Sequence, residues 1–127
     1  AAQKKFGERG AFHCRLLEET EVKTLDKFDL VMGIGVLHHL DDTAAEEFMK
    51  LAKGALKPGG RILTLDPCFA KGQNPFAKLL IHMDRGQNVR SPGEYSALAY
   101  RVFEQVNSSI THQRWIPYTH YVMECVA

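Results

Sequence analysis

The chain has 127 residues, of which 45% are apolar and 24% charged, and its net charge is +1. A single domain of this size can bury a core, while the near-neutral charge and a longest apolar run of only residues 30–37 argue against a nucleic-acid or membrane surface. The cysteines Cys14, Cys68 and Cys125 are far apart without a Cys-x-x-Cys motif, which indicates free thiols and a cytoplasmic protein.

The N-terminal quarter of the chain predicts short elements. Residues 1–8 are polar helix formers and predict the end of a helix. Residues 11–17 alternate loosely between apolar and polar side chains, which predicts a short strand. Residues 18–27 are charged and contain threonine, so we expect a loop or a short helix there.

The segment after them organises the rest of the chain. Residues 28–34 are apolar at positions that would face both sides of a sheet. This pattern predicts a central parallel strand that is covered by helices on each side. The strand leads into a polar loop with His38 and His39, and ligands of open α/β sheets bind at such strand ends.

A helix and a second strand follow the histidine loop. Thr43 and Glu46 fit a capping box at the start of the helix, and the Pro-Gly-Gly sequence at 58–60 would stop it. Residues 61–66 predict the next strand. Strand, helix and strand form a βαβ unit, so we expect two parallel strands with a right-handed crossover.

The C-terminal half predicts two more helices and a strand pair. Asn74 precedes a proline and would cap one helix, and the segment 91–94 fits a capping box for the other. The tail segments 105–114 and 118–126 are rich in β-branched and tyrosine residues and are split by Pro117. They predict two antiparallel strands joined by a tight turn.

Two motifs in this order are similar to those of a known family. Residues 28–40, FDLVMGIGVLHHL, and residues 56–63, LKPGGRIL, together resemble the second half of class I S-adenosylmethionine-dependent methyltransferases. The resemblance covers nearly the whole chain, so residues 1–127 would be one domain. It implies an α/β fold: part of a Rossmann-like sheet that is mostly parallel, with a C-terminal antiparallel strand pair and helices on both faces.

The sequence also departs from that family. The family's G-x-G-x-G loop after its first strand has no counterpart here, and neither does the acidic residue that holds the ribose. Gly33-Ile34-Gly35 is no substitute, because it opens no helix. We therefore expect an N-terminally truncated methyltransferase domain that by itself is inactive and carries no bound cofactor.

The resemblance implies where S-adenosylmethionine would lie in the whole protein. Its methionine and adenosine portions would border Gly33, Ile34, Gly35, Val36 and Leu37. The alternative is that the two glycines only let a helix or a loop pack close to the strand.

His38 and His39 are the candidate catalytic residues. A histidine that titrates near neutral pH at a strand end can act as a general base. The alternative is a capping or solvent-facing pair that only shapes the loop. The two residues are adjacent and have no third ligand nearby in the sequence, so they do not predict a metal site.

Polar residues between the last two helices are candidates for binding a sugar, phosphate or carboxylate, although a solvated connection explains them equally well. These residues are Asp84, Arg85, Gln87, Asn88 and Arg90. The tail hairpin contributes packing residues or, as the alternative, the wall of a substrate pocket. Its candidates are His112, Trp115, Tyr118 and His120.

Methyl transfer to an unidentified small molecule is the leading functional interpretation. A nucleotide-binding Rossmann-type oxidoreductase would need a dinucleotide fingerprint, and a non-catalytic methyltransferase-like fragment is the third possibility.

The missing first strand of the family also predicts an interaction. Without that strand, the apolar strand at 28–34 has an open edge, and such edges recruit other chains. We expect either self-association through this edge or coverage of it by residues 11–17.

Overall fold

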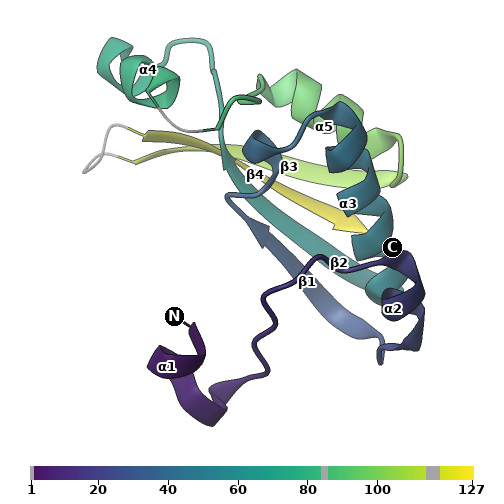
Figure 1. Ribbon diagram of the computed structural model, residues 1–127. Coiled ribbons are helices and arrows are strands. Elements are labelled where there is room, and N and C mark those ends of the chain that lie inside the picture. The colour runs from purple at the N-terminus through teal and green to yellow at the C-terminus, as the bar shows by residue number, and fades with distance from the viewer. Residues whose placement is uncertain (1, 84–85, 114–117) are drawn as a thin grey trace.

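The computed structural model describes residues 2–83, 86–113 and 118–127. Within them the chain forms a four-stranded sheet in the order β1-β2-β4-β3 (Figure 1). The strands are β1 (Phe28–Ile34), β2 (Leu56–Pro67), β3 (Gln105–Gln113) and β4 (Tyr118–Val126). β1 and β2 are parallel, and the other two pairings are antiparallel, which confirms the predicted βαβ unit and the antiparallel pairing of the tail strands. The predicted tight turn between the tail strands lies outside the described residues.

The helices occur in the order expected from the sequence. They are α1 (Ala2–Phe6), α2 (Glu19–Thr24), α3 (Asp42–Ala55), α4 (Pro75–His82) and α5 (Pro92–Tyr100), with 3-10 turns η1 (Gly7–Arg9) and η2 (Leu37–His39). Among the described residues, no helix combines the length and the apolar character that a membrane crossing needs.

The start of α3 differs from the prediction. Asp41 is the N-cap residue, and its side chain accepts a hydrogen bond of 2.8 Å from the backbone N–H of Ala44. The predicted capping box at Thr43 and Glu46 is therefore wrong. A carboxylate both accepts the free N–H and interacts favourably with the positive helix end, and this favours the earlier start.

β2 is longer than predicted, because it begins at Leu56. The Pro-Gly-Gly segment at 58–60 makes an irregularity in the strand instead of a separate turn, and the β1–β2 register shifts there. Gly59 has a φ of 75°, a conformation that glycine adopts without strain.

The core lies between the sheet and the pair α3 and α5, which pack on the same face (Figure 1). Val31 and Gly33 of β1 point to this face, in register with Ile62 and Thr64 of β2. The largest fully buried hydrophobic side chains of the core cluster are Tyr95, Phe103, Leu37, Met49, Ile62 and Met123.

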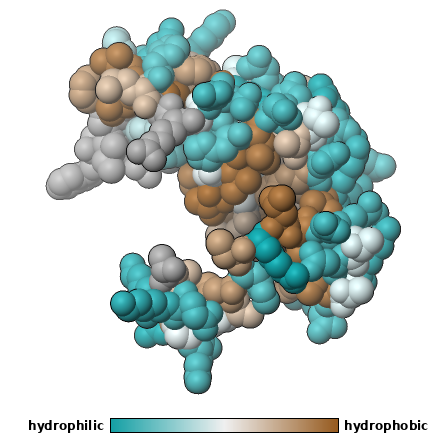
Figure 2. Space-filling model, in the orientation of Figure 1, coloured by the Kyte–Doolittle hydropathy of each residue, from teal (hydrophilic) through white to brown (hydrophobic). Residues whose placement is uncertain are grey.

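β1 is an edge strand, and its other face is bare. Phe28, Leu30, Met32 and Ile34 are 44%, 50%, 58% and 50% exposed, and hydrophobic surface lines the hollow beside the N-terminal segment (Figure 2). The prediction of a central strand covered on both sides is wrong for the described residues, because they give β1 only one strand neighbour and helices on only one face.

Residues 11–17 do not form the predicted strand. They are extended but exposed, and they lead from η1 to α2 while the N-terminal segment projects away from the sheet (Figure 1). Apolar alternation stabilises a strand only when a neighbouring strand pairs with its backbone, and no described strand pairs with this segment.

The N-cap assignment predicts a difference between two neighbouring variants. Asp41→Ala removes the cap and should lower the free energy of unfolding by about 1 kcal/mol, whereas Thr43→Ala should change it by less than about 0.5 kcal/mol. Urea unfolding followed by circular dichroism measures both. A larger loss of unfolding free energy in Thr43→Ala than in Asp41→Ala would support the capping box instead.

Candidate functional site

A buried pair of ionisable side chains lies at the carboxyl ends of β1 and β2. His38 is in η2, directly after β1, and Asp66 is near the end of β2. The ring Nδ1 of His38 lies 2.8 Å from Asp66 Oδ1, and the backbone N–H of His38 donates to the same oxygen at 3.2 Å. His38 is 5% exposed and Asp66 1%. Parallel pairing brings the two residues together, because it places both carboxyl ends at the same edge of the sheet.

This hydrogen bond fixes the tautomer of the neutral ring. An ionised carboxylate can only accept hydrogen bonds, so Nδ1 of His38 carries the proton and Nε2 keeps a lone pair. The ring of His39 lies against that of His38 at an interplanar angle of 40°, with centroids 3.9 Å apart, but His39 is exposed. Of the two predicted catalytic residues, only His38 has, among the described residues, a carboxylate partner that orients a general base.

One atom of this pair and one atom of a neighbouring residue are buried without a hydrogen-bond partner among the described residues. They are Oδ2 of Asp66 and Nδ1 of His120. Burial lowers the pKa of His120, against the opposing effect of the Asp66 carboxylate, so its imidazole is neutral at neutral pH. Unsatisfied atoms of this kind are costly and are the groups that a bound polar molecule can satisfy.

The loop before α5 packs directly on His38. A Cβ atom at Gly86 would lie 2.1 Å from Cδ2 of the His38 ring, so only glycine fits there without movement. The backbone N–H of Asn88 donates to the carbonyl of His38 at 3.0 Å. The loop therefore holds both the ring and the backbone of His38 in place.

Arg90 fastens the same loop to η2. Its five N–H groups all have acceptors: the carbonyls of Leu37, Leu40 and Asn88, and the carboxylate of Asp42, which receives two of the bonds. Arg90 is also buried. A guanidinium has five donors, so none is left for a substrate, and the geometry gives Arg90 a structural role.

The residues predicted to border the cofactor divide into two groups. Gly33 and Leu37 belong to the core: a Cβ at Gly33 would lie 2.9 Å from the ring of Phe48, and Leu37 is fully buried. Ile34, Gly35 and Val36 remain accessible at the strand end. Gly35 has a φ of 65°, and its N–H donates to Leu65 at 2.8 Å.

The predicted substrate residues are only partly gathered around the His38–Asp66 pair. Gln87 is exposed, and Asn88 is half-buried beside His38. Tyr118 and His120 are half-buried, with ring centroids 5.1 Å apart. In the tail hairpin, His112 bonds instead to the Thr119 hydroxyl at 3.3 Å. Three further candidates, Asp84, Arg85 and Trp115, lie outside the described residues.

Neighbouring groups at the end of β2 are structural. Burial raises the pKa of the Cys68 thiol to about 11, so it is not a nucleophile at neutral pH. The Tyr95 hydroxyl donates to the carbonyl of Pro67 at 3.0 Å, and burial also raises its pKa. Both groups keep their protons, and the Tyr95 hydroxyl holds the strand end that carries Asp66.

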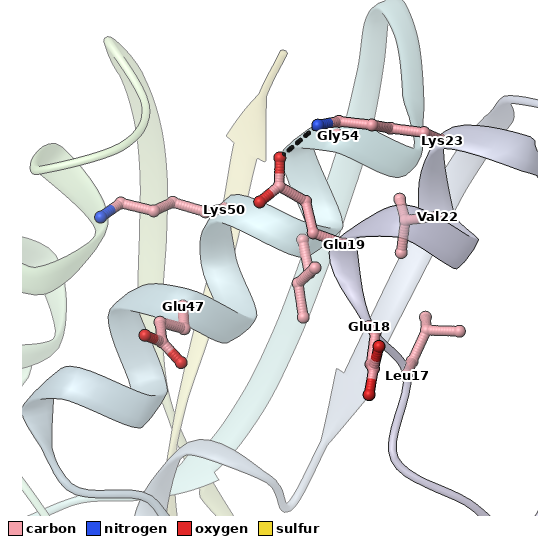
Figure 3. A pocket seen from close by; sticks show the side chains of 9 residues that line it. Leu17, Glu18, Glu19, Val22, Lys23, Glu47, Lys50 and Gly54 are labelled. Carbon is pink, nitrogen blue, oxygen red and sulfur yellow. Dashed lines mark ion pairs between the residues drawn. The ribbon is translucent and has the colours of Figure 1, made fainter.

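A cavity of about 570 Å³ lies elsewhere, between α2 and α3 (Figure 3). Both of its lysines are paired: Lys23 forms a 2.7 Å ion pair with Glu19, and Lys50 forms a 2.8 Å pair with Glu46 outside the cavity. It is lined by Leu17, Glu18, Glu19, Val22, Lys23, Glu47, Lys50, Leu51 and Gly54. With no unsatisfied buried polar atom among these residues, the cavity is a weaker candidate than the His38–Asp66 pair.

Sequence reasoning missed Asp66 and Gly86. The sequence pattern could have identified Asp66, because an acidic residue at the end of the strand parallel to β1 must lie near the loop after β1. Gly86 had no such signal, since its role depends on the path of the loop across the His38 ring.

The chain is similar to a known protein family. A family model described as "Methyltransferase domain" matches residues 1–64, which is half of the chain. No curated protein sequence matches the chain.

Several solved structures share the fold. The S-adenosylmethionine-dependent methyltransferase SibL in its apo form is 18% identical with a TM-score of 0.71, over 98% of this chain and 38% of that one. Human N-acetylserotonin methyltransferase in complex with SAM is 19% identical, with a TM-score of 0.60 over 81% and 31%. A structure titled "A Pericyclic Reaction enzyme" is 13% identical, with a TM-score of 0.62 over 82% and 28%.

The chain spans about a third of the length of the structures it matches. At these identities the likeness establishes the fold, and the different titles show that one fold serves more than one chemistry. The function must therefore be argued from the site.

The contact between Gly86 and His38 predicts an unequal effect of two Gly→Ala variants. Gly86→Ala should lower the free energy of unfolding by about 1–3 kcal/mol, because the new methyl group overlaps the His38 ring. Gly93→Ala should be neutral or slightly stabilising, because open space surrounds its Cβ position in α5. Urea unfolding of both variants is the measurement, and equal stabilities would contradict the packing described.

The bonding of Arg90 gives a second pair of variants. Arg90→Lys leaves at most three donors for four acceptor groups and should cost about 2–4 kcal/mol. Arg101→Lys, at an exposed arginine that bonds Glu46 at 3.3 Å, should cost less than about 0.5 kcal/mol. Thermal and urea unfolding compare the two variants. An Arg90→Lys variant as stable as the wild type would show that the five hydrogen bonds of Arg90 are not needed for folding.

Proposed function

Because the chain belongs to the methyltransferase domain family, we propose that the whole protein transfers a methyl group from S-adenosylmethionine to a small molecule. We propose His38 as its general base. The observation that carries this proposal is the buried His38–Asp66 hydrogen bond at the carboxyl ends of two parallel strands. It supplies an oriented base beside the accessible strand end at Ile34–Val36.

The residues present fit one wall of a cofactor site. Gly35 adds no side chain at the strand end, and beside it Ile34 is exposed and Val36 half-buried. S-adenosylmethionine supplies a methyl group on a sulfonium, and transfer forms the bond from methyl to acceptor, breaks the bond from methyl to sulfur and leaves S-adenosylhomocysteine. The G-x-G-x-G loop is not in this sequence, so we expect the 127-residue chain alone to bind the cofactor weakly and to be inactive.

His38 would serve an acceptor that carries a proton. As the acceptor oxygen or nitrogen attacks, its proton moves to Nε2 of His38, and the Asp66 carboxylate stabilises the imidazolium that forms. A base is needed only when the acceptor has a proton to lose, which favours a hydroxyl or an amine. The bond to Asp66 also holds the ring in one orientation, as in-line transfer requires.

Polar residues near the His38–Asp66 pair would orient the acceptor. We propose Asn88 and Gln87 from the loop, and Tyr118 and His120 from β4, with the unpartnered Nδ1 of His120 as a hydrogen-bonding group. Asp84 and Arg85 remain proposals from the sequence. We also propose the cytoplasm as the compartment, in keeping with the unpaired state of all three cysteines.

The role of His38 predicts a kinetic difference between the two adjacent histidines. In the whole protein, His38→Gln should slow formation of S-adenosylhomocysteine by about 10²- to 10⁴-fold, because the proton acceptor is lost. His39→Gln should stay close to the wild-type rate. The assay follows S-adenosylhomocysteine over a panel of small hydroxyl- and amine-bearing acceptors, and both variants should retain cofactor affinity. Full activity of His38→Gln would remove the proposed base.

Calorimetry separates methyl transfer from the other interpretations. The whole protein should bind S-adenosylhomocysteine, and this chain alone should bind it weakly or not at all. NAD binding by the whole protein in place of S-adenosylhomocysteine would support an oxidoreductase instead. No binding of either ligand would support a non-catalytic role.

A further inference from the structure

The ring of His38 is enclosed on most sides. Its Nδ1 is occupied by the hydrogen bond to Asp66, and the ring of His39 lies against it with centroids 3.9 Å apart. The side chain of His38 is only 7% exposed. The access from solvent to Nε2, the atom proposed as the base, is therefore narrow.

Nε2 of His38 can nevertheless be reached. Among the described residues, the side-chain atoms that are both enclosed and unpartnered are Oδ2 of Asp66 and Nδ1 of His120, and Nε2 of His38 is not one of them. The hydrogen bonds of His38 to other described residues use its Nδ1 and its backbone. A nitrogen that is neither enclosed nor hydrogen-bonded keeps some exposed surface. The small exposed part of the His38 side chain thus includes Nε2.

Two glycines border the access to Nε2. In an imidazole ring, Nε2 is bonded to the carbon atoms Cε1 and Cδ2. A Cβ atom at Gly35 would lie 3.6 Å from Cε1 of His38, and a Cβ atom at Gly86 would lie 2.1 Å from Cδ2. Each glycine thus lies beside one of the two carbons that flank Nε2. The opening between them exists because neither residue carries a side chain.

Hydrogen bonds hold both borders of this opening in place. On one side, the N–H of Gly35 donates to the carbonyl of Leu65 in β2 at 2.8 Å. On the other side, the N–H of Asn88 donates to the carbonyl of His38 at 3.0 Å, and Arg90 donates to the carbonyl of Asn88 at 3.1 Å. Breaking these bonds would leave polar groups unpaired, which is costly where they are buried. We therefore expect the opening to keep its width when an acceptor arrives.

We propose that this opening selects the acceptor by shape, so that the methylated hydroxyl or amine stands on an unbranched carbon. The inference deepens the proposed function and rests on it, because the acceptor must give its proton to Nε2 of His38. A branched carbon carries a second substituent next to the reacting atom, and this substituent would overlap the backbone at Gly35 or Gly86. One excess methyl group in a fitted site costs about 10- to 200-fold in rate. Gly35 and Gly86 thus determine specificity.

Alkylation of the 127-residue chain measures the opening without methyl transfer. With iodoacetamide, Nε2 forms a bond to the unbranched carbon, the carbon–iodine bond breaks, iodide leaves, and the ring becomes an imidazolium that keeps its Nδ1 proton. The comparison reagent is α-iodopropionamide, which has one more methyl group on the reacting carbon. Exposed His13 reports the intrinsic difference between the reagents. In peptide mass spectrometry, His38 should discriminate against the branched reagent about tenfold or more beyond His13.

Two Gly→Ala variants test the border of the opening. Gly35→Ala places a methyl group 3.6 Å from Cε1 and should slow alkylation of His38 by iodoacetamide about tenfold or more. The matched control is Gly59→Ala, which should react as the wild type does. The φ angles of Gly35 and Gly59 are 65° and 75°, so both variants bear similar backbone strain, but open space surrounds the Cβ position of Gly59. Circular dichroism checks folding, and the wild-type comparison decides if Gly35→Ala is unfolded.

The whole protein tests the selection itself. Methyl transfer should favour primary alcohols and amines over their secondary isomers by about 10- to 200-fold. Equal transfer to both kinds of acceptor overturns the proposal. So does a His38 that reacts with neither reagent or that discriminates no more than His13. If the whole protein methylates no acceptor, that result counts against the proposed function, whereas the alkylation ratio still decides whether the opening exists.

Discussion

The parallel pairing of β1 and β2 is the constraint on which the rest of the structure depends. It requires α3 to cross over one face, and this places the apolar side of α3 against Val31, Gly33 and Ile62. It also brings both carboxyl ends to one edge of the sheet. The hydrogen bond between His38 and Asp66, 28 positions apart in the chain, is a direct consequence of that pairing.

The loop before α5 makes a second set of contacts that holds His38 in place. Parallel pairing brings His38 near Asp66 but does not fix the ring, because η2 is a single short turn whose carbonyls depend on partners from the loop before α5. Arg90 satisfies the carbonyls of Leu37 and Leu40, and Asn88 bonds that of His38. The loop with Asn88 and Arg90, which the sequence suggested as a substrate-binding loop, thus has a structural role. Substrate contacts are left to side chains that do not take part in these hydrogen bonds.

Patterns among residues that are close in the sequence predicted most of the fold. Features that depend on contacts between distant residues could not be predicted. The cap of α5 and the antiparallel pairing of the tail strands depend on neighbours in the sequence, and both predictions were confirmed. Residues 11–17 had the alternation of a strand, but a strand also needs a partner that alternation cannot reveal. Gly33 shows the same limit at the site. Its sequence context allowed either a cofactor contact or close packing of a helix. The ring of Phe48 at its Cβ position supports the packing, and the cofactor contact stays a prediction.

β1 links the candidate site to the open edge. Its carboxyl end leads to Gly35 and His38, and its outer edge has no strand neighbour among the described residues. Whatever pairs with this edge therefore ends beside the accessible strand end and helps to form the opposite wall of any cofactor site there. A strand that pairs there in parallel would bring its own carboxyl end and the loop after it to this position. Such a pairing extends the row of strand ends at which α/β sheets bind ligands.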